Sequence, residues 1–254
     1  PRWKVISDDV YLQETGYKIA TDVPLVSVAI INGRLYAASA TQLFQLQDRQ
    51  LAKVAAPTDK IRHIETVGGQ LWLLGEQGLW RYDKSGWTEV SPEAFTDISE
   101  HLRKVVVATA QHLFEVTPDG LKRIDTEDQN KPPILDVESY AETLYVRHAD
   151  RVGLLELGRI NYFDVDDWGQ LPLGSKTRDM RALGGKLVVA TDRGLGVLRG
   201  LAWRNLSGRD GLCYEDTTCV ADGFDHGYWL GTTRGAIRAV NGEFHFFGHE
   251  RWIP

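Results

Sequence analysis

The sequence predicts an all-β fold, a β-propeller of six four-stranded blades, on three observations. First, an apolar run, a short polar turn and a second apolar run recur six times, and the first runs start near residues 35, 71, 105, 144, 187 and 228. Second, these starts lie 34 to 43 residues apart, which is the period of a propeller blade. Third, apolar and polar residues alternate within the runs, as they do in half-buried strands.

Each repeat has room for four strands. A further apolar run that ends in a tight turn precedes the hairpin, for example over residues 25–33 and 61–69. A run with an aromatic residue follows it, as at residues 86–90 and 202–206. Four strands per repeat make one blade of a propeller. Six such blades account for nearly all of residues 1–254, so we expect a single domain.

The two ends of the chain do not fit whole blades. Residues 1–22 contain one short outer-strand pattern at Trp3–Ile6, and we expect this segment to close the ring beside the last blade, because open sheet edges invite association. Residues 251–254 begin a further pattern, so seven blades are the alternative to six. The chain is also compatible with further domains in a longer parent protein.

Composition narrows the possible partners. The formal net charge of −6 argues against general affinity for nucleic acid or for an anionic membrane surface. No apolar run reaches the roughly 18 residues that a membrane-spanning helix needs, so we expect no membrane insertion. The only two cysteines, Cys213 and Cys219, either form a disulfide, as in a secreted protein, or remain free thiols.

The repeat register predicts where a binding site lies. In a propeller, the turn between the second and third strands of each blade opens on the same face as the segment that enters the first strand. Superposing the six repeats gathers basic, imidazole and phenol groups on this face: His63, His112, His148, Arg151, Arg178, Arg193, Tyr214 and Arg234. Such a concentration in an acidic protein favours an anionic ligand.

Several of these residues also have a purely structural interpretation. Arg193 and Arg234 either face a ligand or pair with neighbouring carboxylates, and His63 either faces a ligand or is a satisfied core imidazole. We expect His112 and His148, at loop corners, to be exposed. Three histidines on one face suit a divalent metal, but no closely spaced pair supports this. We therefore expect no metal and no cofactor.

The last two repeats carry a family resemblance. The runs at residues 203–207, 210–212, 219–223 and 228–236 resemble the two-component regulator propeller repeat, in which an aromatic-rich turn leads to an Asp-Gly-Leu loop and then to a Trp-x-Gly-Thr hairpin. The second repeat fits this pattern less fully. The resemblance implies an extracytoplasmic, periplasmic or secreted propeller of the kind seen in polysaccharide sensors, polysaccharide lyases and glycosidases.

Three functions from different classes follow. The first is recognition of an anionic polysaccharide or oligosaccharide, with His63, Arg151, Arg178, Arg193 and Arg234 as ligand-binding residues. The second is a polysaccharide lyase or glycosidase that acts on uronic-acid-containing glycans. In it an arginine neutralises the carboxylate, His112 or His148 is the base, and Tyr214 or a histidine is the acid. The third is a protein-interaction scaffold. Whether the protein is an enzyme stays open.

Overall fold

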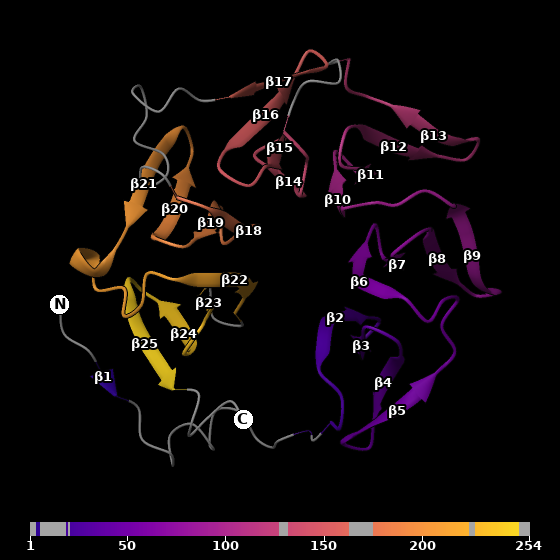
Figure 1. Cartoon of the computed structure of the whole chain (residues 1–254), viewed down its shortest axis with the longest axis horizontal. Helices are drawn as coiled ribbons and strands as arrows, with labels where there is room; N and C mark the ends of the chain where they lie inside the picture. Colours follow the sequence, from indigo (N-terminus) through magenta and orange to yellow (C-terminus); the bar gives the residue numbers. More distant parts are fainter. Residues whose placement is uncertain are drawn as a thin grey trace. The chain divides into compact units, whose positions relative to one another are not determined.

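The computed structural model contains six sheets, each built on four antiparallel strands (Figure 1), and one of them gains a fifth strand from the N-terminus. The structure describes residues 4–5, 19, 21–126, 132–162, 175–223 and 227–248. The four antiparallel strands of each sheet follow one another in the chain, and their order in the sheet is their order in the sequence. This is an all-β, six-bladed β-propeller, so the predicted fold class and blade number are confirmed.

The chain divides into two compact units, and the first, residues 17–135, holds blades one to three. Their strands are β2 (Leu25–Ile31), β3 (Arg34–Ser39), β4 (Leu43–Gln47), β5 (Gln50–Val54), β6 (Ile61–Val67), β7 (Gln70–Gly75), β8 (Leu79–Asp83), β9 (Gly86–Ser91), β10 (Asp97–His101), β11 (Lys104–Ala108), β12 (Leu113–Thr117) and β13 (Gly120–Arg123). The first strands lie next to each other, since β6 contacts both β2 and β10.

The second unit, residues 136–254 with residues 1–16, holds blades four to six. Their strands are β14 (Asp136–Tyr140), β15 (Thr143–Arg147), β16 (Val152–Glu156), β17 (Arg159–Tyr162), β18 (Thr177–Leu183), β19 (Lys186–Thr191), β20 (Gly194–Arg199), β21 (Ala202–Leu206), β22 (Thr217–Asp222), β23 (Tyr228–Thr232), β24 (Gly235–Val240) and β25 (Glu243–Gly248). Here β18 contacts both β14 and β22, so the first strands again lie next to each other.

The N-terminal strand adds to the last blade. β1 (Lys4–Val5) pairs in parallel with β25, with Lys4 opposite His245 and Val5 opposite Phe246 (Figure 1). The sixth sheet therefore has a fifth strand on its outer edge, at the outer-strand pattern that the sequence shows at Trp3–Ile6. Most of the remaining N-terminal segment, and the expected start of a further pattern at residues 251–254, lie outside the described residues.

Burial on both faces explains why the second strand of each blade is the clearest signal in the sequence. Five of the six residues of β7 are buried, and the same holds for β19. A strand that packs between two sheets has no solvent side, so it shows a continuous apolar run instead of alternation. In the first unit Leu71 and Leu73 pack with Ile64 and Leu43. In the second unit Leu187 and Val189 pack with Met180 and Leu198.

The turns between first and second strands differ in chemistry but share one conformation. Asn32 and Gly33 both have positive φ, 51° and 72°, which two-residue hairpin turns require. The equivalent turn of blade three uses Leu102 and Arg103, at 49° and 63°, and that of blade four uses Ala141 and Glu142. Side chains with a Cβ disfavour this region. The less typical repeats therefore keep the blade geometry at some expense of backbone strain.

Two glycines of blade five test this backbone geometry. Gly194 starts the third strand, and Gly185 lies in the turn between the first and second strands. An added Cβ at Gly194, whose φ is 117°, would overlap the backbone carbonyl oxygen of Leu206, whereas a Cβ at Gly185, φ 72°, would meet nothing within 4 Å. We expect Gly185→Ala to lower the free energy of unfolding by about 1 kcal/mol. Gly194→Ala should lower it by about 3 kcal/mol or more, because strain and overlap add. Urea denaturation measures both; equal losses would contradict the close approach of the Leu206 carbonyl to Gly194.

Candidate functional site

The turns between second and third strands are built by one repeated hydrogen-bond pattern. A hydroxyl at the end of the second strand accepts the N–H of the residue two positions on and donates to the carbonyl three positions on. Ser39, Thr109, Thr191 and Thr232 all do this. This local turn chemistry is typical of Ser and Thr, and it fixes the residue that follows the hydroxyl in an equivalent place in these four blades.

These turns are joined to the segments that enter the first strands. In the first unit Ile61 N donates to the Ala40 carbonyl over 2.8 Å, and in the second unit Thr177 N donates to the Ala149 carbonyl over 2.9 Å and Gly194 N to the Glu215 carbonyl over 2.7 Å. The turn of one blade thus bonds the segment that enters the next blade. We call the surface made by these turns and entering segments the turn face. Within each unit, the predicted shared face is present.

In the second unit, the segment that enters blade six is shaped by the Asp-Gly-Leu run. Ser207 caps the short helix at Gly208–Asp210, and the Asp210 carboxylate accepts the Ser207 N–H over 3.1 Å. Gly211 follows with φ 96°, and Leu212 is buried in the core between blades five and six. Glu215 closes the loop by accepting the Gly208 N–H over 2.7 Å. These contacts explain why the segment that enters blade six carries an Asp-Gly-Leu run: the Asp caps the short helix, the Gly takes the positive φ and the Leu packs in the core.

This loop presents Tyr214 to the turn of blade six. The Tyr214 ring packs on Phe246, with centroids 4.7 Å apart, and the guanidinium carbon of Arg234 lies 5.4 Å from the Tyr214 centroid. Arg234 is exposed, and across the described part of the chain no carboxylate forms an ion pair with it. An aromatic ring beneath a guanidinium holds its plane while its N–H edges stay free for a ligand.

Two other predicted arginines are paired with carboxylates. Arg178, within β18, lies 2.7 Å from Asp216, which joins the first strand of blade five to the segment that enters blade six. Arg151 binds its neighbour Asp150 through two hydrogen bonds, of 3.0 and 3.2 Å, and holds the pKa of that carboxyl below its usual value. Arg193 is exposed at the turn position of blade five that Arg234 occupies in blade six. The arginines therefore do not form one uncompensated basic surface.

The prediction that His148 is exposed is wrong. Its exposed fraction is 0%, and its Nε2 lies 3.2 Å from the Tyr162 hydroxyl. Its carbonyl accepts a hydrogen bond from the Thr177 hydroxyl, which ties the blade-four turn to the next blade. The sequence places His148 at a turn, but the contacts that bury it come from residues 14 and 29 positions away. In this position the ring is out of reach of a polymeric substrate.

The other two histidines belong to the first unit. The His112 side chain is 24% exposed, and its Nδ1 lies 3.3 Å from the buried carboxylate of Asp125. His63 lies within β6 and not in an entering segment, and its ring nitrogens contact Ser27 Oγ at 3.1 Å and Glu65 Oε2 at 2.8 Å. Neither histidine therefore faces a ligand without a partner. Of the predicted site residues in the second unit, Tyr214 and Arg234 lie against each other.

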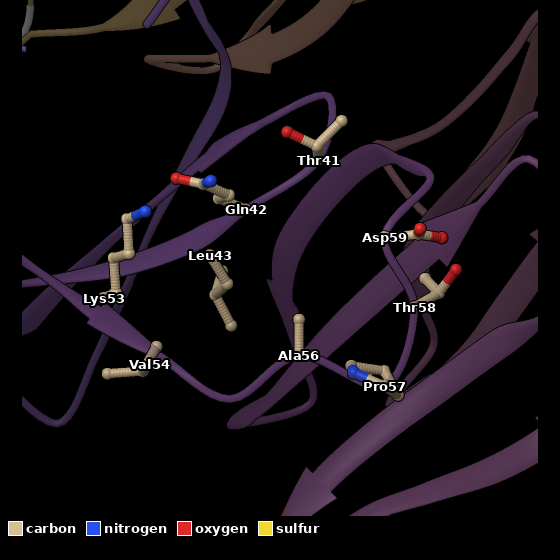
Figure 2. A pocket seen from close by; sticks show the side chains of 9 residues that line it. All are labelled: Thr41, Gln42, Leu43, Lys53, Val54, Ala56, Pro57, Thr58 and Asp59. Carbon is tan, nitrogen blue, oxygen red and sulfur yellow. The ribbon is translucent and has the colours of Figure 1, made fainter. Parts of the chain in front are cut away.

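A pocket of about 540 Å³ opens on the turn face of the first unit (Figure 2). Thr41 and Gln42 of the blade-one turn line one side, and Pro57, Thr58 and Asp59 of the segment that enters blade two line the other. None of the predicted site residues reaches it. In the second unit a pocket of about 450 Å³ lies between blades five and six, but its aromatic residues Trp203, Tyr228 and Phe244 also pack in the apolar core.

Both cysteines are free thiols in the structure. Cys213 is half-buried and Cys219 is exposed on β22. Burial raises the pKa of the Cys213 thiol. A thiol held protonated in this way is a poor nucleophile.

The sequence interpretation missed a row of polar side chains on the first strands. Five of them stand eight positions before the first apolar residue of the repeated hairpin, and the sixth stands nine positions before it: Ser27, His63, Asp97, Asp136, Asp179 and Cys219. Their cross-strand partners are equivalent in all six blades. Aligning the six repeats on their hairpins shows this row, because a polar residue stands eight positions before the hairpin in five of them, and Cys219 stands nine positions before it in the sixth.

Three members of the row bind the backbone of the next blade. Ser27 Oγ accepts the Ile64 N–H over 3.2 Å, Asp136 Oδ2 accepts the Met180 N–H over 3.1 Å, and Asp179 Oδ2 accepts the Val220 N–H over 2.7 Å. In each case the donor follows the equivalent row position of the next blade. Burial, and then the nearby Asp136 carboxylate, raise the pKa of Asp179 above the usual 3.8.

Comparison with known proteins supports the fold and leaves the function open. No protein-family model matches the sequence, and no curated protein matches it. Virginiamycin B lyase from Staphylococcus aureus has a similar structure, with a TM-score of 0.72 and 13% identity over 90% of this chain and 85% of that one. The extracellular domain of BT4673 from B. thetaiotaomicron, described as a hybrid two-component system, gives 0.69 and 17% over 88% of this chain.

This chain spans 34% of that BT4673 chain, so the match concerns one part of it. The WD40 propeller domain of Doa1 is similar as well, with a TM-score of 0.66 and 11% identity over 90% of this chain and 80% of that one. The resemblance to sensor propellers therefore holds for the fold. Because the fold is shared by a lyase, a sensor domain and a WD40 domain, it does not choose a function. No helix in the described residues is long and apolar enough to cross a membrane.

The raised pKa of Asp179 predicts a pH dependence of stability. The folded state favours its protonated form, so this residue's contribution to the free energy of unfolding falls as pH rises from about 3.8 through the raised pKa. Asp179→Asn removes that loss, so we expect the free energy of unfolding of the variant, relative to the wild type, to rise with pH over this range. Hydrogen bonds from Ser207 and Arg204 lower the pKa of Asp210, so its contribution to stability is lost as pH falls from about 3.8 through that lowered pKa, and Asp210→Asn should become less stable than the wild type as pH rises through this lower range.

Urea denaturation at a series of pH values measures both differences. A stability difference from the wild type that does not rise with pH above about 3.8 for Asp179→Asn, or that does not fall with rising pH below about 3.8 for Asp210→Asn, would contradict the environments described for these carboxyl groups.

Proposed function

We propose that the protein is a carbohydrate-recognition propeller that binds an anionic glycan, and that Arg234 on the turn face of the second unit contacts a glycan carboxylate. The observation that carries this proposal is the exposed guanidinium of Arg234, held over the Tyr214 ring with no ion pair in the described chain. A guanidinium in this state is prepared to bind a carboxylate through two parallel hydrogen bonds.

The surroundings of Arg234 favour recognition of a single ligand carboxylate over attraction of a polyanion by a large basic surface. Arg178 and Arg151 are already paired with Asp216 and Asp150, so attraction of a polyanion by the whole face is weak. Recognition then depends on where a carboxylate meets Arg234. Tyr214 is a positioning residue in this proposal, because one side of its ring is covered by the arginine.

Recognition is favoured over elimination by the state of the predicted bases. Elimination across a uronic acid needs a base beside the cation that neutralises the carboxylate. His148 is buried against Tyr162, and the Nδ1 atom of His112 lies 3.3 Å from the buried carboxylate of Asp125. The fold likeness to the extracellular domain of BT4673 supports an extracytoplasmic location for such a glycan-binding protein.

Calorimetric titration with uronate oligosaccharides tests this proposal. The same oligosaccharides with methyl-esterified carboxylates serve as the matched ligand, and we expect them to bind at least about tenfold more weakly. Arg234→Ala should weaken binding of the uronate form about 10- to 100-fold, as expected for loss of hydrogen bonds to a charged group. Arg234→Lys should retain part of the affinity, because it keeps the charge without the fork.

Arg159→Ala is the control, because Arg159 is exposed in the same unit at the start of β17, on the turn between third and fourth strands. It should leave the affinity unchanged. Equal binding of esterified and free uronates, or no effect of Arg234→Ala, would overturn the proposal. Ultraviolet absorbance from an unsaturated product during the incubation would show a lyase in place of a pure binding protein.

A further inference from the structure

A second cluster, independent of the glycan proposal, lies on the first strands of the first unit. His63 and Glu65 are two residues apart on β6, so their side chains leave the same face of that strand. Asp97 starts β10 at the row position equivalent to that of His63, and β10 contacts β6. One imidazole and two carboxylates from neighbouring blades therefore meet at one place.

The ligand atoms of the three side chains are close enough to share an ion. One atom from each residue lies within 4.8 Å of the others, and His63 Nε2 lies 2.8 Å from Glu65 Oε2. Metal–ligand distances are about 2.0–2.2 Å for histidine nitrogen and carboxylate oxygen on zinc, so two ligands of one ion lie roughly 3–4 Å apart. Among the described residues, this is the one group of three such side chains with this spacing.

Ser27 determines which nitrogen of His63 is available. The Ser27 hydroxyl donates its single proton to the Ile64 carbonyl over 2.9 Å, so its oxygen acts as an acceptor toward His63 Nδ1 at 3.1 Å. The Nδ1 atom therefore carries the proton, and in the neutral ring Nε2 has a lone pair. This lone pair points at the Glu65 carboxylate. A hydrogen bond that fixes the outer nitrogen and aims the inner one is typical of metal-binding histidines.

A lone pair that faces a carboxylate needs a cation between them. Either a second proton on the imidazole or a metal ion meets this need. Asp97 favours the metal ion, because its buried carboxylate, 7% exposed, offers an oxygen within 4.8 Å of the ligand atoms of both other residues. A proton is shared by two groups, whereas a metal ion accepts ligand atoms from all three.

We propose that His63, Glu65 and Asp97 bind a divalent transition metal ion, for which zinc is the probe. One nitrogen and two oxygen ligands suit zinc or manganese better than calcium or magnesium, which prefer oxygen alone. The His63 and Glu65 side chains are 27% and 24% exposed, so water can complete the coordination. The ion joins β6 to β10, and Ser27 connects it to β2.

Calorimetric titration of the chelator-treated protein with zinc tests this site. We expect one ion per chain and a rise in the unfolding temperature, because the ion binds the folded state alone. His63→Ala and the isosteric Asp97→Asn should each weaken zinc binding at least about tenfold, as loss of a ligand does. The control is His245→Ala. His245 also lies two residues from a glutamate on a strand, with Nε2 3.6 Å from Glu243 Oε2, but it belongs to no group of three in the described residues.

Nitrogen NMR of the His63 ring makes the test independent of how the variants fold. We expect a proton on Nδ1 and a change of the Nε2 shift on addition of zinc. A ring with protons on both nitrogens that does not respond to zinc would overturn the proposal in favour of a simple imidazolium–carboxylate pair. Zinc binding that His245→Ala abolishes and His63→Ala does not would also overturn it.

Discussion

The hydrogen bond from a first-strand side chain to the backbone of the next blade is the constraint on which the rest of the structure depends. The first strand of each blade pairs with the second strand on one edge only, and the other edge carries N–H groups that need acceptors. Ser27, Asp136 and Asp179 supply acceptors for Ile64, Met180 and Val220. These bonds set the register of blade one against two, of four against five and of five against six, pairs of blades that share no β-ladder.

The turn face follows from this register. Once neighbouring first strands are fixed, the turn of one blade bonds the segment that enters the next, as Gly194 does with Glu215. Side chains on these turns then have defined neighbours, and Arg234 comes to lie over Tyr214 although they are 20 residues apart. The same row also supplies His63 and Asp97 to the proposed metal site. One row of side chains thus serves both the register between blades and the proposed metal site.

The sequence was sufficient for the fold because a blade is a local unit. The period, the buried second strands and the Ser and Thr turns all involve residues close in the chain, and they predict six blades and the turn face. Side-chain environment was not predictable in the same way. His148 is buried by Tyr162 and Thr177, and Arg178 is paired with Asp216 of the next blade. The row of polar side chains on the first strands could have been predicted from the sequence. It becomes visible only when the six repeats are aligned, because each repeat contributes a single polar residue to an apolar run.

Hydrogen exchange of the Val220 amide tests the role of the polar row most directly. Val220 N–H has the Asp179 carboxylate as its acceptor, over 2.7 Å. The account predicts that this amide is protected in the wild type to the same degree as amides inside the β22–β23 ladder, and that Asp179→Ala removes this protection while the ladder amides keep theirs. A Val220 amide that exchanges in the wild type as fast as an exposed turn amide would contradict it.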